Sequence, residues 1–257
     1  MSQAVRQIIE TQTGIGAGLC SHMPDPLERM LKSNMQTIRL GQYLLAEAQA
    51  ANSVFVLLNG WLSLSKSLPD GEIQIVDFAL PGEIIETCAA EGAVSAVSIE
   101  ALTDVRVAII ALPLWEEMKR HRPDLTRISR AVRAAASART AERMLRLGRG
   151  NAMRRMAYAL LELNIRLEAT GQAREGKFHL PMNQRVLGDF VGLSSVHVCR
   201  TLGQMVGNGT LRMGANMHVE ILKRDLMAEI AGVDLKILQS GIRAESSLMA
   251  SAPPTLA

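Results

Sequence analysis

The pattern of hydrophobic positions along the chain changes from strand-like to helical near its middle. Between residues 35 and 112, short apolar or alternating runs are separated by glycine, proline, asparagine and aspartate. Runs of this kind are typical of strands, and Asp70-Gly71 between two alternating runs is a good hairpin signal. The runs predicted as strands are 43–46, 53–58, 61–68, 73–80, 97–102 and 105–112. They predict a small antiparallel barrel or roll.

Helical spacing of apolar residues begins after Pro113, and the segment 124–147 contains neither proline nor glycine. Gly148 and Gly150 are predicted to end this long helix. Its apolar residues recur at spacings of three and four, on one narrow stripe: Leu125, Ile128, Val132, Ala135, Ala138, Ala141 and Leu145. A narrow stripe favours a helix–helix seam in a two-fold dimer. The alternative is that this stripe packs against the β domain of its own chain.

Shorter elements are predicted at both ends of the chain. Pro24 and Pro26 fit the start of a short helix through Leu31, because proline is tolerated in a first turn. Helices are expected at 152–169, 183–191, 194–206, 223–230 and 233–240, and a small hairpin from 210–212 and 217–222. The predicted fold is therefore α+β, with an antiparallel β-roll, a long helix and further short helices with a hairpin.

These patterns divide the chain into five segments. We expect a flexible arm at 1–25, a β-roll domain at 26–122, a dimerisation helix at 123–148, a domain of short helices and a hairpin at 149–241 and a disordered tail at 242–257. At 257 residues the chain is long enough for two modest domains that each bury a core.

The charge is divided between the two halves of the chain. Residues 1–118 carry 6 Lys/Arg and 14 Asp/Glu, whereas residues 119–257 carry 22 and 11. Lys and Arg that contact phosphates release condensed counterions, so a basic half suggests a polyanionic partner. The segment 119–166 alone holds 13 Lys/Arg against 3 Asp/Glu, which favours double-stranded DNA over a purely protein-binding scaffold.

Several classes of protein do not fit the sequence. No apolar run reaches the roughly 18 residues that a membrane-spanning helix needs, so we expect a cytoplasmic protein without membrane contact. Cys20, Cys88 and Cys199 are too widely spaced for a disulfide framework. No catalytic motif or metal-ligand spacing is present, so neither an enzyme nor a metal site is predicted.

The segment 183–202 is typical of a helix-turn-helix. Val186, Leu187 and Phe190 fall on the inner face of its first helix. Gly192 permits the tight turn, and Ser194 can cap the second helix. Val198, Leu202 and Met205 then point inward, which leaves Ser195, Val196, Cys199 and Arg200 facing outward near the helix N-terminus.

The segment 182–230 resembles the winged helix-turn-helix of the Crp/Fnr family of bacterial transcription regulators. Gly60, Asp70-Gly71 and Pro81-Gly82 resemble turns of that family's cyclic-nucleotide-binding-like β-roll. The similarity covers roughly residues 26 to 240, with the three modules in the same order. It implies a homodimer that binds a palindromic DNA operator and contacts RNA polymerase.

The resemblance assigns roles within the outward face. Arg200 matches the family's arginine that contacts guanine, whose O6 and N7 suit a guanidinium. Val196 stands where many members have glutamate; valine cannot accept from cytosine but can touch a thymine methyl group. The complete set expected at DNA is Arg185, Ser194, Ser195, Val196, His197, Cys199, Arg200 and Thr201.

Two of these residues have alternative interpretations. His197, one residue inward, is interpreted as a phosphate neighbour or a partly buried packing residue rather than a pH switch. Cys199 stands where relatives have a small residue, and its size alone explains it. The sharper hypothesis is redox control, because oxidation of this thiol would add bulk beside phosphates.

The effector of the β-roll is not identified by the sequence. In cyclic-AMP receptors of this family, an arginine-serine pair binds the cyclic phosphate; here that pair falls near Ser95-Ala96, and residues 79–103 contain no Lys or Arg. Cyclic AMP is therefore not expected, and Cys20 alone cannot hold an iron–sulfur cluster. Haem through His22, His121, Cys20 or Cys88, or an unidentified ligand, remains the alternative to a regulator without cofactor.

Overall fold

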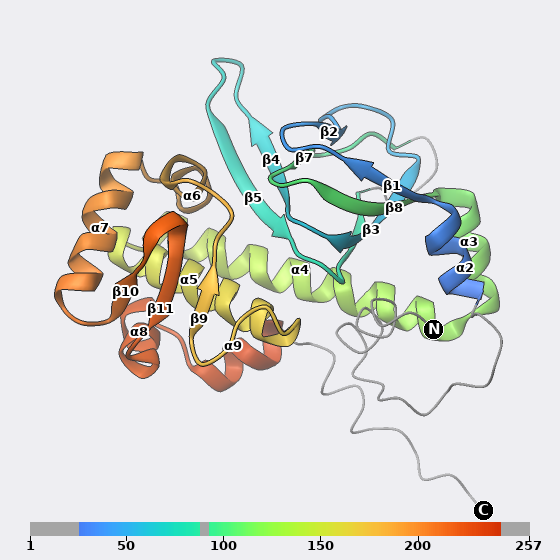
Figure 1. The fold of residues 1–257 in the computed structure, drawn as a ribbon. Helices are drawn as coiled ribbons and strands as arrows, with labels where there is room; N and C mark the ends of the chain where they lie inside the picture. The colour runs from blue at the N-terminus through green and yellow to red at the C-terminus, as the bar shows by residue number, and fades with distance from the viewer. Residues whose placement is uncertain (1–25, 88–92, 243–257) are drawn as a thin grey trace, which may run out of the picture.

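The computed structural model describes residues 26–87 and 93–242. The predicted arm at 1–25 and all but the first residue of the predicted tail lie outside these ranges, as do Cys20, His22 and Cys88. The chain forms a β-roll, a long helix and a winged helix-turn-helix in that order, which confirms the α+β prediction (Figure 1). Within the described residues, no helix is both long and apolar enough to cross a membrane.

Two four-stranded antiparallel sheets make up the β-roll. Their strand orders are β1-β8-β3-β6 and β2-β7-β4-β5. The strands are β1 Met35–Ile38, β2 Tyr43–Leu45, β3 Ser53–Asn59, β4 Leu62–Ser67, β5 Ile73–Ala79, β6 Ile84–Glu86, β7 Ser98–Ala101 and β8 Val105–Ala111. Each of the six predicted runs overlaps a strand. The strands β1 and β6 were not predicted; β1 is largely exposed and so has no buried apolar face to reveal it.

Apolar side chains from both sheets meet inside the roll, and a second cluster lies where helices cover it. Helices α2 (Pro26–Ser33) and α3 (Leu112–His121) pack on the first sheet. Trp115 of α3 is fully buried there beside Leu125 and Ile128 of the long helix. The start of the long helix is therefore part of the core of its own roll.

The long helix α4 spans Pro123–Arg149 and runs beneath the roll into the winged domain (Figure 1). Gly148 lies inside this helix, and Gly150 alone caps it, so the prediction that both glycines end it was wrong for Gly148. A short turn at Gly150 and Asn151 leads into α5.

The predicted apolar stripe of α4 divides into two parts. Leu125, Ile128 and Ala135 are buried against the same chain, as the alternative interpretation required. Further along, Ala138, Ala141 and Leu145 are exposed. The buried face instead continues at helical spacing as three arginines, Arg139, Arg143 and Arg146. The sequence prediction followed small side chains, whereas the buried face follows charged side chains with partners on other elements.

The winged domain surrounds α5 (Ala152–Ala169), most of whose side chains are buried. The helices around it are α6 Gln184–Val191, α7 Ser195–Gly207, α8 Arg224–Ala231 and α9 Leu235–Ile242. The predicted hairpin is present as β10 (Leu211–Met213) and β11 (His218–Ile221), joined through the short 3-10 helix η1 (Ala215–Met217). An unpredicted strand, β9 (Lys177–His179), completes a three-stranded sheet in the order β10-β11-β9.

Candidate DNA interface and its link to the roll

Local hydrogen bonds define the turn between α6 and α7. Asn183 accepts from the backbone N–H of Val186 at 3.0 Å and caps α6. Ser194 caps α7, as predicted. Gly192 ends α6 in the left-handed conformation, with φ at 65°. A Cβ atom at Gly188 would lie 2.3 Å from the carbonyl oxygen of Leu193, so the two helices meet too closely there for a side chain.

The two faces of α7 are as predicted. Val198, Leu202 and Met205 are buried in the domain core. On the opposite face Ser195, Val196, Cys199 and Arg200 are exposed. Val196 is 65% exposed, which is unusual for a valine and leaves its methyl groups free for contact. Among the described residues, none forms a hydrogen bond or ion pair with the Arg200 guanidinium, so its donors are available to a ligand.

The remaining predicted DNA residues differ in accessibility. Arg185 is exposed near the start of α6. His197 is also exposed rather than partly buried, with its Nδ1 atom 2.8 Å from Ser194 Oγ. Thr201 is 4% exposed, and its hydroxyl donates to the carbonyl of His197 at 2.7 Å. Its side chain is thus used inside the helix, so we remove Thr201 from the expected interface.

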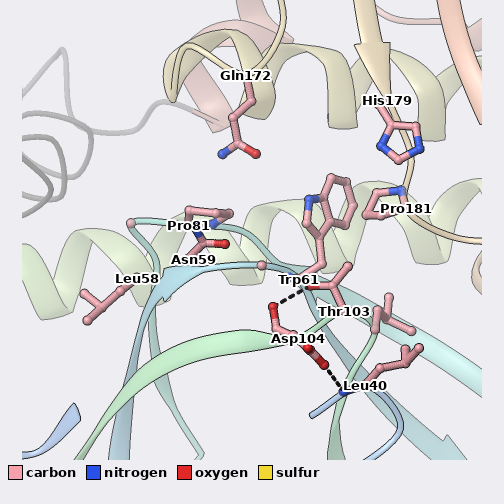
Figure 2. A pocket seen from close by; sticks show the side chains of 13 residues that line it. Leu40, Leu58, Asn59, Trp61, Pro81, Thr103, Asp104, Gln172, His179 and Pro181 are labelled. Carbon is pink, nitrogen blue, oxygen red and sulfur yellow. Dashed lines mark hydrogen bonds between the residues drawn. The ribbon is translucent and has the colours of Figure 1, made fainter. Parts of the chain in front are cut away.

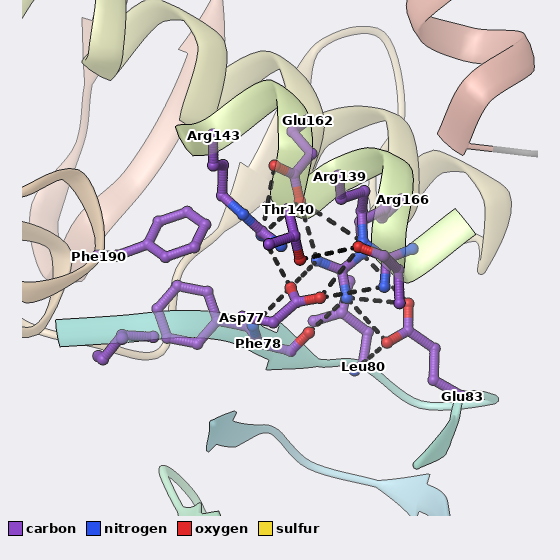
Figure 3. A network of polar contacts seen from close by, with 12 residues as sticks. Asp77, Phe78, Leu80, Glu83, Arg139, Thr140, Arg143, Glu162, Arg166 and Phe190 are labelled. Atoms are coloured by element: carbon purple, nitrogen blue, oxygen red, sulfur yellow. Dashed lines mark hydrogen bonds and ion pairs between the residues drawn. The ribbon is translucent and has the colours of Figure 1, made fainter. Parts of the chain in front are cut away.

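A buried network of ion pairs joins the roll to α4 and α5 (Figure 3). Asp77 of β5 lies at its centre. Its carboxylate accepts from Arg143 at 2.9 Å, Arg166 at 3.0 Å and Arg139 at 3.1 Å. Glu162 of α5 accepts from Arg143 and Arg166, both at 3.1 Å.

Arg166 closes this network on the roll side. It also donates to Glu83 at 2.8 Å and to the carbonyl oxygen of Phe78. The side chains of Arg139, Arg143 and Arg166 are at most 9% exposed, and that of Glu162 is fully buried. Burial alone would raise the pKa of Asp77, but the guanidiniums of Arg143, Arg139 and Arg166 outweigh it and hold that pKa well below its ordinary range.

This network was not predicted from the sequence. The basic excess of segment 119–166 was interpreted as phosphate-binding charge, but Arg139, Arg143, Arg146 and Arg166 are buried. A signal was present: the spacing of three and four that runs through Leu125, Ile128 and Ala135 continues through these α4 arginines. Part of the basic excess of this segment is therefore neutralised by carboxylates inside the protein and is not available to phosphates.

The structure tests whether the roll fits an anionic nucleotide. A cavity of about 160 Å³ lies between the roll and α4. The sequence suggested no counter-charge here, yet the helices supply Arg133, Arg139 and Arg166. The last two are paired with Asp77, Glu83 and Glu162, and Arg133 lies 3.7 Å from Glu86. The described lining residues do not fit a cyclic nucleotide, because each guanidinium among them has a carboxylate beside it and none is free to pair with the phosphate.

A larger cleft of about 910 Å³ separates the roll from the strand β9 side of the winged domain (Figure 2). Trp61, Thr103 and Asp104 of the roll face Gln172 and His179 across it. None of its described lining residues is Lys or Arg. The Asp104 carboxylate accepts from the backbone N–H of Leu40 at 2.9 Å. This cleft also lacks the charge that an anionic nucleotide requires.

Of the other positions considered for an effector, His121 and Ser95 lie within the described residues. His121, at the end of α3, is exposed, with Nδ1 2.9 Å from the carbonyl oxygen of Glu117. Ser95 is buried, and its hydroxyl donates to the carbonyl oxygen of Val97 at 2.6 Å, which is a structural use of this position.

Two parts of the chain match known protein families. A family described as cyclic nucleotide-binding domain matches residues 35–121, and one described as Crp-like helix-turn-helix domain matches residues 154–230. The nitrogen fixation regulation protein FixK of Bradyrhizobium diazoefficiens is 32% identical, over 66% of this chain and 71% of that protein. The transcriptional activator protein Anr of Pseudomonas aeruginosa is 26% identical, over 82% and 86%.

A solved structure has the same arrangement of modules. FixK2 from Bradyrhizobium japonicum matches with a TM-score of 0.69 and 27% identity, over 76% of this chain and 96% of that one. The order of roll, long helix and helix-turn-helix is therefore shared with a solved structure of a related protein. This chain belongs to the Crp/Fnr family of bacterial transcription regulators.

Proposed function

We propose that this regulator binds a two-fold symmetric DNA operator as a homodimer, and that it does so without cyclic AMP. The observation that carries the proposal is the exposed face of α7, where Arg200 has no partner among the described residues and Val196 is 65% exposed. A helix in the major groove presents its N-terminal residues to base edges, and these residues lie in the first two turns of α7.

Each residue of the interface has a distinct role. Arg200 donates to O6 and N7 of a guanine, and Val196 contacts a thymine methyl group. Ser195 and Cys199 are exposed beside them and complete the same face. Outside this face, Arg185, Ser194 and His197 are placed to contact phosphates, and such contacts position the protein without specifying sequence.

The dimer interface of this proposal is the exposed face of α4. Ala138 and Ala141 are exposed in the single chain, and Met144 and Leu145 are 69% and 56% exposed. Small and apolar side chains at helical spacing suit close packing of two helices around a two-fold axis. The units 26–122, 123–148 and 149–241 would then act as roll, dimer helix and reading domain, with RNA polymerase as a further expected partner.

A second candidate input is oxidation of Cys199. This thiol is exposed and unpaired, on the same face as Arg200. Oxidation would place a bulkier and more polar group where the helix meets DNA. The effector-sensing alternative lacks comparable support, because the cavity beside α4 holds paired charges.

The operator can be found by selecting random duplex DNA with the purified chain and sequencing the bound fraction. We expect a two-fold symmetric motif containing a G·C pair in each half-site. Fluorescence anisotropy on that operator should show an affinity that falls steeply as salt rises. A selected pool without any symmetric motif would overturn the proposal.

Two arginine variants distinguish recognition of bases from contact with phosphates. Arg200→Ala should lose about 1–3 kcal/mol of discrimination between the operator and its G·C-substituted version. Arg185→Ala is the matched control, because Arg185 is exposed on α6 and is assigned to a phosphate contact, which positions the protein without specifying sequence. It should weaken binding to all sequences alike. If Arg200→Ala still selects the same operator, the assignment of α7 as the reading helix is wrong.

A further inference from the structure

Strand β5 of the roll caps the first helix of the helix-turn-helix. The Nε2 atom of Gln74 donates to the carbonyl oxygens of Asp189 at 2.7 Å and Phe190 at 3.1 Å. These carbonyls belong to the last turn of α6, where backbone acceptors have no partner within the helix. A side chain more than 110 residues upstream thus stabilises the end of α6 just before the turn at Gly192.

The same strand contacts α6 through an aromatic pair. The rings of Phe78 and Phe190 lie 4.6 Å apart between centroids, and both residues are buried (Figure 3). Trp61 packs edge-on against Phe78 at 5.9 Å, and the Arg143 guanidinium lies 5.1 Å from the Phe190 ring. Phe190 is therefore held between the roll and α4.

Between these two contacts, Asp77 joins β5 to the other helices. It accepts from Arg139 and Arg143 of α4 and from Arg166 of α5. Within five residues, β5 is thus attached to α4, α5 and α6. A displacement of α6 relative to α4 would break the half-buried hydrogen bonds of Gln74 and separate the ring of Phe190 from Phe78 and Arg143.

These contacts have a geometric consequence if two chains pair through α4. The turn at Gly192 holds α7 against α6. The angle between α4 and α6 therefore determines how far apart the two copies of α7, the recognition helices, lie in the dimer. Adjacent major-groove half-sites on one face of DNA are about 34–36 Å apart, and one added base pair both shifts and rotates them.

We propose that β5 fixes the recognition helix relative to α4, and that Gln74 and Phe78 are positioning residues which set the half-site spacing that the dimer accepts. This inference rests on the proposed function, namely two-fold binding to an operator. It gives the roll a role in reading DNA that needs no bound effector.

The test measures spacing preference rather than affinity alone. Four duplexes are titrated by fluorescence anisotropy: the selected operator, versions with one base pair added or removed between the half-sites, and one half-site alone. Gln74→Glu keeps the length of the side chain but replaces the Nε2 donor with an acceptor. We expect it to lower the preference for the native spacing by about two- to twelve-fold, the net worth of a hydrogen bond. Affinity for the single half-site should change no more than in the control.

Gln36→Glu is that control, because Gln36 is exposed on strand β1 and the variant adds the same charge to the roll. It should keep the wild-type spacing preference. Phe78→Leu should lower the preference as Gln74→Glu does; if it does not fold, Gln74→Glu decides alone. An unchanged ratio in Gln74→Glu, or an equal loss on every duplex, would overturn the role of β5. A wild type that binds as a dimer but without spacing preference would overturn it too, whereas failure to select any symmetric operator would overturn the proposed function first.

Discussion

Arg200 and Arg166 are both arginines of the winged domain, in opposite surroundings. Arg200 is exposed on α7, without a partner among the described residues, whereas Arg166 is 3% exposed and donates to Asp77, Glu83 and Glu162. An exposed guanidinium is free to bind bases or phosphates. A buried one has been removed from water and is stable only with its carboxylates in place.

This difference separates two kinds of contribution to function. Changes at Arg200 should alter which DNA is bound without altering the stability of the fold. Changes around Arg166 should alter stability and the placement of the helix-turn-helix without touching DNA. The two regions can therefore be separated by measuring unfolding and DNA selectivity on the same variants.

The largest expected effect is on stability, from Asp77→Asn. This change leaves Arg139, Arg143 and Arg166 with one carboxylate fewer, and breaking one side of a buried ion pair costs about 3–5 kcal/mol. Urea unfolding followed by circular dichroism at pH 7 measures the free energy of unfolding. Glu72→Gln, on the exposed tip of the same β4–β5 hairpin, is the control and should change it by less than about 0.5 kcal/mol. An equal effect of both variants would contradict the burial of the network.

The second effect is a pH dependence that belongs to the same carboxylate. The pKa of Asp77 is well below its ordinary range in the folded chain, so the network contributes fully above the unfolded-state pKa of about 3.9. That contribution is lost as the pH falls through the lower, folded-state pKa. The difference in unfolding free energy between wild type and Asp77→Asn should therefore be constant from pH 7 to about 5 and narrow below about pH 4. A difference that is unchanged at pH 3 would contradict the assignment.

The two regions also differ in how far the sequence could predict them. The reading face of α7 follows from local spacing: Val198, Leu202 and Met205 mark the inner side, so Val196 and Arg200 must lie outside. The network depends on partners far along the chain, since Asp77 lies 62 residues from Arg139 and 89 from Arg166. No local period shows which carboxylate a buried arginine will meet.

The same reasoning explains smaller errors. Thr201 was expected at DNA, but a threonine within a helix can return its hydroxyl to the carbonyl four residues earlier, and Thr201 does so with His197. The α4 stripe was extended through Ala138 and Ala141, because alanine is a more usual buried residue than arginine. Only the folded chain shows that Arg139 pairs with Asp77 of β5 and Arg143 with Glu162 of α5.

An intermediate effect is expected from Val196→Glu, which changes selectivity but not stability. Glutamate can accept from the N4 amino group of cytosine, whereas valine cannot. Selection from random DNA should then recover a half-site with one base pair changed, and discrimination between the two operators should reverse by about 1–3 kcal/mol. Because Val196 is 65% exposed, the urea midpoint should stay at the wild-type value. Recovery of the wild-type motif would mean that this position does not touch a base.

The smallest effect in reducing buffer is expected from Cys199→Ser, which exchanges one small exposed side chain for another and should leave operator affinity unchanged. The informative comparison between this variant and the wild type is made after oxidation. Hydrogen peroxide oxidises a thiolate by two electrons to a sulfenic acid, and further to a negatively charged sulfinate. Beside DNA phosphates, that charge should lower the affinity of the wild type, and Cys199→Ser should be insensitive. Cys88→Ser retains the thiol of α7 and should respond as the wild type does. If peroxide leaves the wild-type affinity unchanged, exposure beside Arg200 is not enough to make Cys199 a switch, and its small size alone explains its place on the reading face.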